Sequence, residues 1–189
     1  MKTLLKNLLQ GLVMICLGTS INGCADNTLT WKEEVKLLDG RVITIEQKRR
    51  YERAYTGQEF GNIPREAWVT FKLPEFGNQD IVWHENLKPH VLNVYEGNLY
   101  IVAMFPTGRE FQQYGSPKPG YVPFKYVDGT WKRILFIDIP DAIYDTNMLT
   151  ANAPPRVGSF VSFADKIEEM KNGKIPKSEK RLNPNWIID

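Results

Sequence analysis

Hydrophobic and polar residues alternate along much of the chain beyond residue 30, which is the pattern of β-strands with one buried face. The first alternating stretch covers residues 31–38, and the alternation resumes over residues 42–46. Asp39-Gly40 lies between them and suits a type I′ turn, whose two central residues need a positive φ. The sequence therefore predicts an antiparallel hairpin, with its second strand extended into the charged residues 48–53. One face of the first strand consists of Trp31, Glu33, Val35 and Leu37.

Two more hairpins are predicted further along the chain. One occupies residues 91–105 and turns at 96–98, and the other occupies residues 121–139 and turns at Asp128-Gly129. Residues 99–104 are apolar on both faces, which predicts a central strand covered on two sides. On the last strand of the third hairpin we expect one shared face for Trp131, Leu135 and Ile137.

Shorter apolar runs at residues 67–73 and 81–83 predict two further strands. The tetrapeptide Glu-Phe-Gly-Asn occurs at residues 59–62 and again at residues 75–78. One interpretation is a duplicated loop that presents aromatic side chains to a ligand. The favoured interpretation is two similar turns, in which Gly-Asn reverses the chain and the phenylalanine packs inward.

The C-terminal part of the chain has a different pattern. Prolines cluster at residues 117–123 and 154–155, and they predict loops or strand ends because proline cannot donate to a β-ladder. Residues 162–172 have helical periodicity, with Ser162 suited to cap the N-terminus and Gly173 suited to end the helix. The apolar face of this helix consists of Phe163, Ile167 and Met170.

Together these elements predict a mainly β fold, either an antiparallel sandwich or a partly open barrel built from hairpins, with one short C-terminal helix. A basic tail follows the helix and ends in the apolar residues 186–188. These residues either dock back on the core, which we favour, or contact a partner.

The first 23 residues are unlike the rest of the chain. Lys2 and Lys6 precede a mostly apolar run at residues 8–17, and small or polar residues follow at 18–20. This is the layout of a secretory signal peptide. The apolar run is too short to cross about 30 Å of hydrocarbon comfortably as a helix. The alternative is an uncleaved N-terminal anchor helix.

The segment Ile21-Asn22-Gly23-Cys24 resembles the lipobox of bacterial lipoproteins, although Asn22 stands where a smaller residue is usual. The resemblance implies that the thiol of Cys24 receives a diacylglycerol, that the signal is cut before Cys24, and that the new amino group is acylated. In this family an Asp directly after the cysteine favours retention in the inner membrane. Ala25 stands there, which implies an outer-membrane protein on the periplasmic face. The alternative is an ordinary signal peptide with an incidental cysteine.

Composition narrows the possible classes. The 189 residues are 42% hydrophobic and 24% charged, which excludes a disordered, a collagenous or a polytopic membrane chain. Cleavage would remove Lys2 and Lys6, leaving 24 − 2 = 22 basic against 22 acidic residues, so no basic field points to nucleic acid. Cys16 would also be removed, so the mature domain would have no disulfide. The predicted organisation is a signal peptide (1–23), a lipidated cysteine and tether (24–30), a β-rich domain (31–158), and a C-terminal helix with a basic tail (159–189).

Motifs for catalysis are mostly missing from the sequence. There is no G-x-S-x-G motif, no P-loop and no dinucleotide-binding glycine pattern. His84, Glu85 and His90 are close enough in sequence for a metal or acid–base site, but structural or exposed histidines are the favoured interpretation. Carboxylate pairs could hydrolyse glycosides if a cleft held them together. We predict no metal, no cofactor and no enzymatic activity.

A Gly- and Pro-rich loop at residues 107–123 is the best candidate for an exposed contact surface. Arginine and tyrosine are favoured in binding hot spots. The candidate residues in this loop are Arg109, Phe111, Tyr114 and Tyr121.

These observations favour a lipid-anchored, periplasmic protein-binding module, for example an inhibitor, an immunity-type protein or an assembly accessory. Its expected partners are the membrane, through covalent lipid, and a protein of the envelope, but not nucleic acid. The alternative is a lipoprotein that binds a small ligand or a glycan through exposed aromatic residues. A hydrolase that uses carboxylates or histidine is a third hypothesis.

Overall fold

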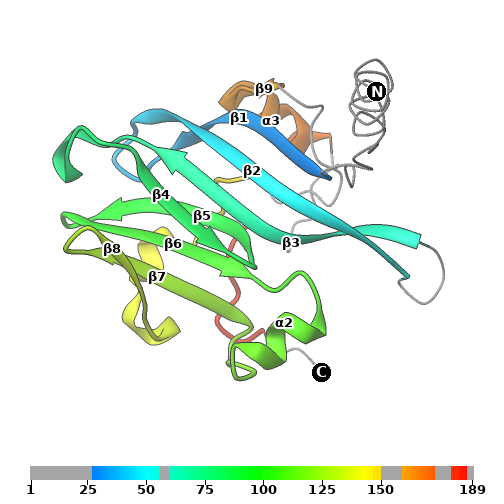
Figure 1. Cartoon of the computed structure of the whole chain (residues 1–189). Helices are drawn as coiled ribbons and strands as arrows, with labels where there is room; N and C mark the ends of the chain where they lie inside the picture. The colour runs from blue at the N-terminus through cyan, green and yellow to red at the C-terminus, as the bar shows by residue number, and fades with distance from the viewer. Residues whose placement is uncertain (1–26, 56–59, 150–158, 173–179, 187–189) are drawn as a thin grey trace, which may run out of the picture.

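The structure is a computed structural model that describes residues 27–55, 60–149, 159–172 and 180–186 (Figure 1). The predicted signal peptide and Cys24 lie outside the described residues. Within the described part of the chain, no helix has both the length and the apolar character needed to cross a membrane.

The first sheet has five strands in the order β4-β3-β2-β1-β9 (Figure 1). All neighbours are antiparallel except β1 and the short β9, which run parallel. These strands are β1 (Thr28–Lys36), β2 (Val42–Tyr55), β3 (Phe60–Phe71), β4 (Ile81–Glu85) and β9 (Phe160–Val161).

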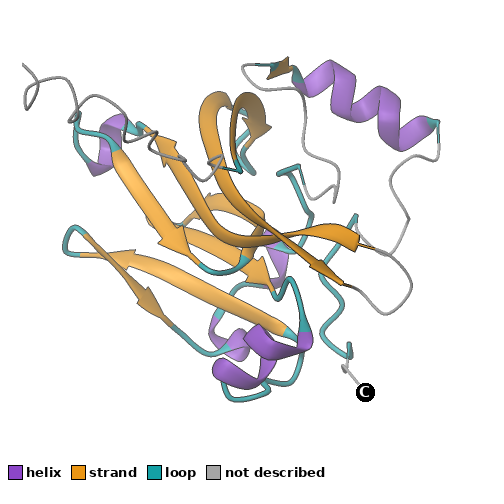
Figure 2. Cartoon of the chain, turned by 45° about the vertical axis from the view of Figure 1, so that its right-hand side comes forward, coloured by secondary structure: helices purple, strands orange, loops and turns teal. Residues whose placement is uncertain are grey.

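The second sheet is an antiparallel meander in the order β5-β6-β7-β8. Its strands are β5 (Lys88–Tyr95), β6 (Asn98–Met104), β7 (Tyr121–Val127) and β8 (Thr130–Arg133). The helices of the described residues are α2 (Gly108–Gln113) and α3 (Phe163–Lys171), and their 3-10 turns are η1 (Pro74–Phe76), η2 (Phe136–Asp138) and η3 (Asp141–Ile143). The two sheets face each other (Figure 2) and do not close into a barrel in the described residues. The predicted mainly β fold is therefore confirmed, in its sandwich form.

Apolar side chains from both sheets form the main core between them. Val69 and Trp83 come from the first sheet, and Ile101 and Phe124 come from the second. A second apolar cluster covers the other face of the second sheet, where Tyr100 and Val102 of β6 pack with side chains from η3 and from Leu182. Strand β6 is thus buried on both faces, as its apolar sequence predicts.

The three predicted hairpins are all present, but the first turn is of another type. Glu96-Gly97 and Asp128-Gly129 both have two positive φ angles, as a type I′ turn requires. At the first turn only Gly40 has a positive φ, of 90°, and its N–H donates to the carbonyl oxygen of Leu37. This is a type I turn followed by a glycine, which the carboxylate of Asp39 supports by accepting the N–H of Arg41 at 3.0 Å.

The third hairpin is shorter than the sequence predicts. Strand β8 ends at Arg133, because its next partner on β7 is Pro123, which has no N–H to donate. The chain leaves the sheet after the N–H of Ile134 bonds to the carbonyl oxygen of Pro123 at 3.1 Å. Leu135 and Ile137 are consequently 69% and 85% exposed, and the expectation that they share a strand face with Trp131 is wrong.

Other boundaries also differ from the prediction. Strand β1 begins at Thr28 and not at residue 31, because Thr28 pairs with Arg50 on the long β2, so the expected tether is shorter. The second Glu-Phe-Gly-Asn segment, residues 75–78, makes a turn, and Phe76 packs on the core there. In the first segment Gly61 and Asn62 belong to β3 and pair with β2.

The helix predicted at residues 162–172 is confirmed as α3. Its N-terminus has the expected cap, since the hydroxyl of Ser162 accepts the N–H of Asp165 and the carboxylate of Asp165 accepts the N–H of Ser162. The position predicted for the end of the helix, Gly173, lies outside the described residues. In the tail, Trp186 docks on the body of the protein against the ring of Tyr121, with centroids 5.1 Å apart.

Two isoleucines test where the stability of this fold arises. We expect Ile101→Ala to lower the free energy of unfolding by about 2–5 kcal/mol, because it leaves a cavity between the two sheets. Ile137→Ala removes the same atoms from an exposed position and should change it by less than about 0.5 kcal/mol. Urea unfolding of both variants measures the difference, and equal losses would contradict this account of the core.

Candidate binding cavity

The four residues predicted as a contact surface do not form one exposed patch. Arg109 is exposed on α2, whereas Phe111 and Tyr114 are half-buried and pack against the main core. Tyr121 is 5% exposed, and its hydroxyl accepts the N–H of Asn183 at 3.0 Å. Helix α2 was not predicted from the sequence. This helix directs some side chains of the loop toward the core.

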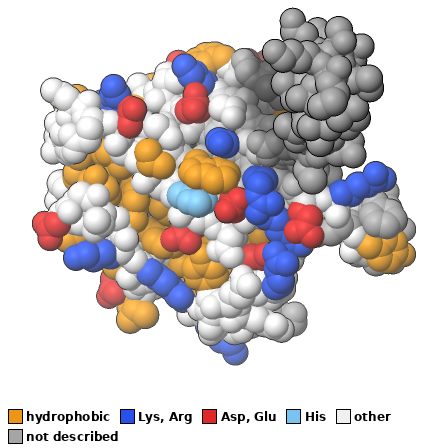
Figure 3. Space-filling model, viewed as in Figure 1, with side chains coloured by type: hydrophobic (Ala, Val, Ile, Leu, Met, Phe, Trp, Pro, Cys, Tyr) orange, Lys and Arg blue, Asp and Glu red, His pale blue; other side chains and the backbone are white. Residues whose placement is uncertain are grey.

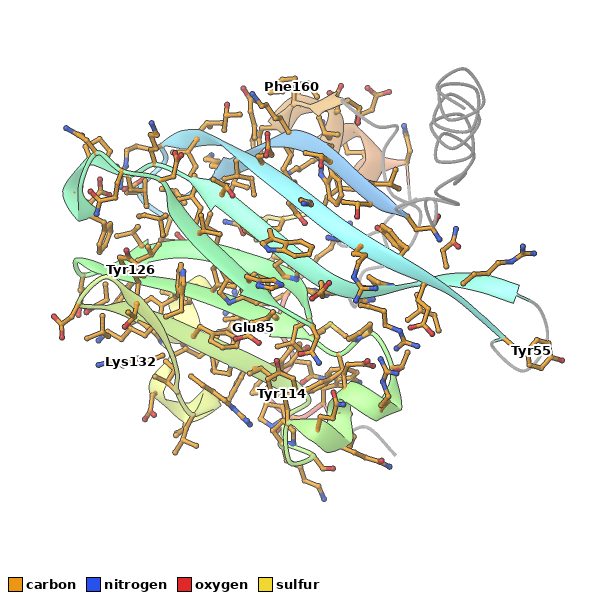
Figure 4. The ribbon with its side chains drawn as sticks, in the orientation of Figure 1. Tyr55, Glu85, Tyr114, Tyr126, Lys132 and Phe160 are labelled. Carbon is orange, nitrogen blue, oxygen red and sulfur yellow. The ribbon has the colours of Figure 1, made fainter. Side chains whose placement is uncertain are left out.

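A buried carboxylate fixes helix α2. Glu110 is fully buried and accepts hydrogen bonds from Arg65 at 3.0 Å and from Arg109 at 2.8 Å, and it also contacts the hydroxyl of Thr107. One turn later the hydroxyl of Tyr114 lies 2.6 Å from the carboxylate of Glu85 (Figure 4). Burial, reinforced by this carboxylate, raises the pKa of Tyr114. These bonds hold α2 against the sheets, so its polar groups serve structure.

The structure separates His84, Glu85 and His90. His84 is exposed on the outer face of the first sheet, while His90 is 3% exposed inside the second. Burial, and then the positive charges of Lys88 and Arg49, lower the pKa of His90 to about 3. In the described residues no group of three or more His, Cys, Asp or Glu side chains is placed to hold a metal ion.

On the outer face, His84 belongs to a cross-strand row with Trp68 and Lys48. Figure 3 shows a histidine side chain beside a hydrophobic one on this side of the molecule. The rings of Trp68 and His84 stack with centroids 4.3 Å apart, and the Nζ of Lys48 lies 5.0 Å from the indole centroid. Two neighbours therefore already contact the indole ring. A sugar that stacked on Trp68 would have to displace one of them, so this tryptophan is a poor glycan platform.

A mostly apolar hollow lies at the other edge of the first sheet. It has a volume of about 550 Å³ and lies between the end of β1, strand β5, residues 142–149, helix α3 and residues 180–181. Its apolar wall consists of Leu37, Leu38, Ala142, Met148, Leu149, Phe163 and Ile167. A concave, mostly apolar hollow with a few polar groups is the usual form of a small-ligand site.

Basic side chains dominate the polar part of this cavity. Its lining includes Lys36, Lys166, Lys180 and Arg181, against one acidic side chain, Asp145. Asp145 is itself paired with Arg181. The cavity therefore has an excess of positive charge beside an apolar wall.

Lys166 lies deepest among these basic groups, and its side chain is 6% exposed. Its Nζ forms an ion pair with the fully buried carboxylate of Glu33 and donates to the carbonyl oxygen of Asn147 at 2.9 Å. Glu33 also accepts the N–H of Leu149 at 3.0 Å and contacts the amide of Gln47. Burial lowers the pKa of Lys166, and the charge of Glu33 opposes this shift.

The sequence contained a signal for this network. Glu33 alternates in phase with Trp31, Val35 and Leu37, so it lies on the buried face of β1. A carboxylate on such a face needs a partner. The partner, Lys166, comes from a helix 133 positions later, and no periodicity connects the two residues.

Comparison of this chain with family models, curated proteins and solved structures finds no match. The functional interpretation consequently depends on the geometry of the chain itself.

The buried His90 should make stability depend on pH. Because its pKa falls from 6.5 to about 3 on folding, the unfolded state binds an additional proton between these values, and acid destabilises the fold. On going from pH 7 to pH 5, the wild type should lose about 2 kcal/mol more unfolding free energy than His90→Leu.

The control for this experiment is His84→Gln, which changes the exposed histidine. Its loss between pH 7 and pH 5, measured by urea unfolding, should equal that of the wild type. If His90→Leu loses as much stability as the wild type, His90 is protonated in the folded protein.

Proposed function

We propose that the mature protein is a binding module of the cell envelope, anchored by lipid on Cys24 at the periplasmic face of the outer membrane. We further propose that it binds a small amphipathic anion and that it catalyses no reaction. The lipobox-like segment supports the anchor. The cavity beside Lys166 carries the proposal for the ligand.

Two properties of the cavity support an amphipathic anion. The apolar wall favours burial of hydrocarbon, at roughly 25 cal/mol per Å². Lys166 is paired with Glu33 and Arg181 with Asp145, and the further positive charge of Lys36 and Lys180 favours a carboxylate, sulfonate or phosphate on the same molecule. Lys36 is placed for this contact at the rim, where its ammonium lies 5.5 Å from the ring centroid of Phe163.

A protein partner is the second candidate, and the outer face of the first sheet favours it. In addition to the row with Trp68, this face has Val82 49% exposed and an ion pair between Arg50 and Glu66. Tryptophan and arginine are enriched in binding hot spots. An inhibitor, an immunity-type protein or an assembly accessory would use such a face.

Two probes of similar shape and opposite charge test whether the cavity prefers an anion. We expect 4-phenylbutyrate to bind the purified lipoprotein and 4-phenylbutylammonium to bind more weakly, because the cavity is basic. Replacing Lys36 and Lys180 together by Gln should weaken binding of 4-phenylbutyrate by about tenfold or more, since charge-assisted hydrogen bonds contribute about 1.5–3 kcal/mol each. Isothermal titration calorimetry measures both constants.

The matched control is the double variant Lys72→Gln with Lys132→Gln, which removes the same charge from exposed positions outside the cavity (Figure 4 labels Lys132). It should bind 4-phenylbutyrate like the wild type. Equal affinity for the two probes, or equal weakening in both double variants, would exclude the cavity as an anion site.

The anchor is tested separately from the ligand. In cells supplied with labelled palmitate, the wild type should incorporate label and fractionate with the outer membrane. Cys24→Ala should lose both properties, because stable attachment needs more than one acyl chain and the variant receives none. Unlabelled wild type, or an alanine variant that stays attached, would show that the membrane association has another cause.

A further inference from the structure

A β-bulge in strand β5 turns His90 into the interior. The pairing of β5 with β6 shifts between Pro89 and Val91, so His90 is an additional residue without a partner position on β6. Its carbonyl oxygen accepts the N–H groups of Asn147 and Met148, each at 3.2 Å. Bulges of this kind redirect a side chain and are frequent beside binding sites.

His90 is among the residues that line a second cavity, of about 330 Å³. The other walls are mostly aromatic or apolar and come from the rings of Tyr121 and Trp186, the thioether of Met104 and the side chain of Leu182. The remaining lining residues are Thr146, Arg181 and Asn183. The guanidinium of Arg181 is engaged by Asp145.

One of the lining residues has a buried polar atom without a partner among the described residues. The Nε2 of His90 is buried and makes no hydrogen bond with any residue that the structure describes. A buried polar group without a partner costs about 1–3 kcal/mol, so an unsatisfied atom in a residue that lines a cavity points to a molecule that occupies the cavity. The neutral imidazole offers an N–H donor or a lone pair at Nε2, depending on its tautomer.

We propose that this cavity binds a small aromatic molecule that carries a hydroxyl group. The ring packs against Tyr121, Trp186 and Met104, since aromatic and thioether groups attract aromatic rings. The hydroxyl bonds to Nε2 of His90, where it can donate or accept. The volume is sufficient, because an apolar cavity of about 150 Å³ already holds benzene.

This site is distinct from the cavity beside Lys166, although both are lined by Thr146 and Arg181. Its ligand is held by one neutral hydrogen bond and aromatic contacts, whereas the other cavity favours an anion. The inference therefore stands if binding of 4-phenylbutyrate fails.

The chain has two histidines, which gives the experiment an internal control. With 15N-histidine in the purified lipoprotein, phenol should shift the Nε2 resonance of His90 in a saturable titration and leave that of the exposed His84 unchanged. Toluene has a similar shape but no hydroxyl. Toluene should displace phenol but bind about tenfold more weakly. The loss of one hydrogen bond of about 1.4 kcal/mol raises the dissociation constant by this factor.

A variant places the effect in the cavity. Leu182→Trp fills space beside His90 and should abolish the shift with phenol, while Leu135→Trp, at an exposed position, should not. The proposal is overturned if phenol leaves His90 unchanged, which would mean that water alone fills the cavity. Equal affinity for toluene and phenol, or an undiminished shift in Leu182→Trp, would also overturn it.

Discussion

The buried ion pair between Glu33 and Lys166 holds together the part of the molecule that surrounds the larger cavity. Two charges removed from water are stable only with each other and with further hydrogen bonds, which Asn147, Leu149 and Gln47 supply. The pair thus connects β1, helix α3 and the segment before residue 150. Removing one partner of such a pair usually costs about 3–5 kcal/mol, because the other charge stays buried and unpaired.

The same interaction explains why helix α3 lies where it does. A second acid of β1, Glu34, accepts the N–H of Phe163 at 2.8 Å, so neighbouring residues on opposite faces of one strand both hold the start of the helix. Phe163 and Ile167 then contribute to the cavity wall. The cavity therefore forms only when the helix is held in this position.

The hairpins and helix α3 could be predicted because their signals are local: alternation, positive-φ dipeptides and a capping serine. The end of β8 could not, since it depends on Pro123 in a neighbouring strand. The cavities could not be predicted from the sequence either, because the residues that line the larger one are spread along the chain from Lys36 to Arg181. His90 was noticed for its neighbour Glu85, whereas its position in the structure follows from a bulge that no residue pattern marks.

The early start of β1 restricts how the body could lie on a bilayer. Thr28 is four positions after Cys24, and an extended chain covers at most about 3.6 Å per residue, so the two residues can be at most about 14 Å apart. Strands β2 and β3 run past Thr28 to Tyr55 and Phe60, so these strand ends lie on the same side of the body as Thr28 (Figure 1). The cavity borders Lys36, at the opposite end of β1. A body anchored at Cys24 would therefore take up its ligand from the aqueous space and not from the leaflet.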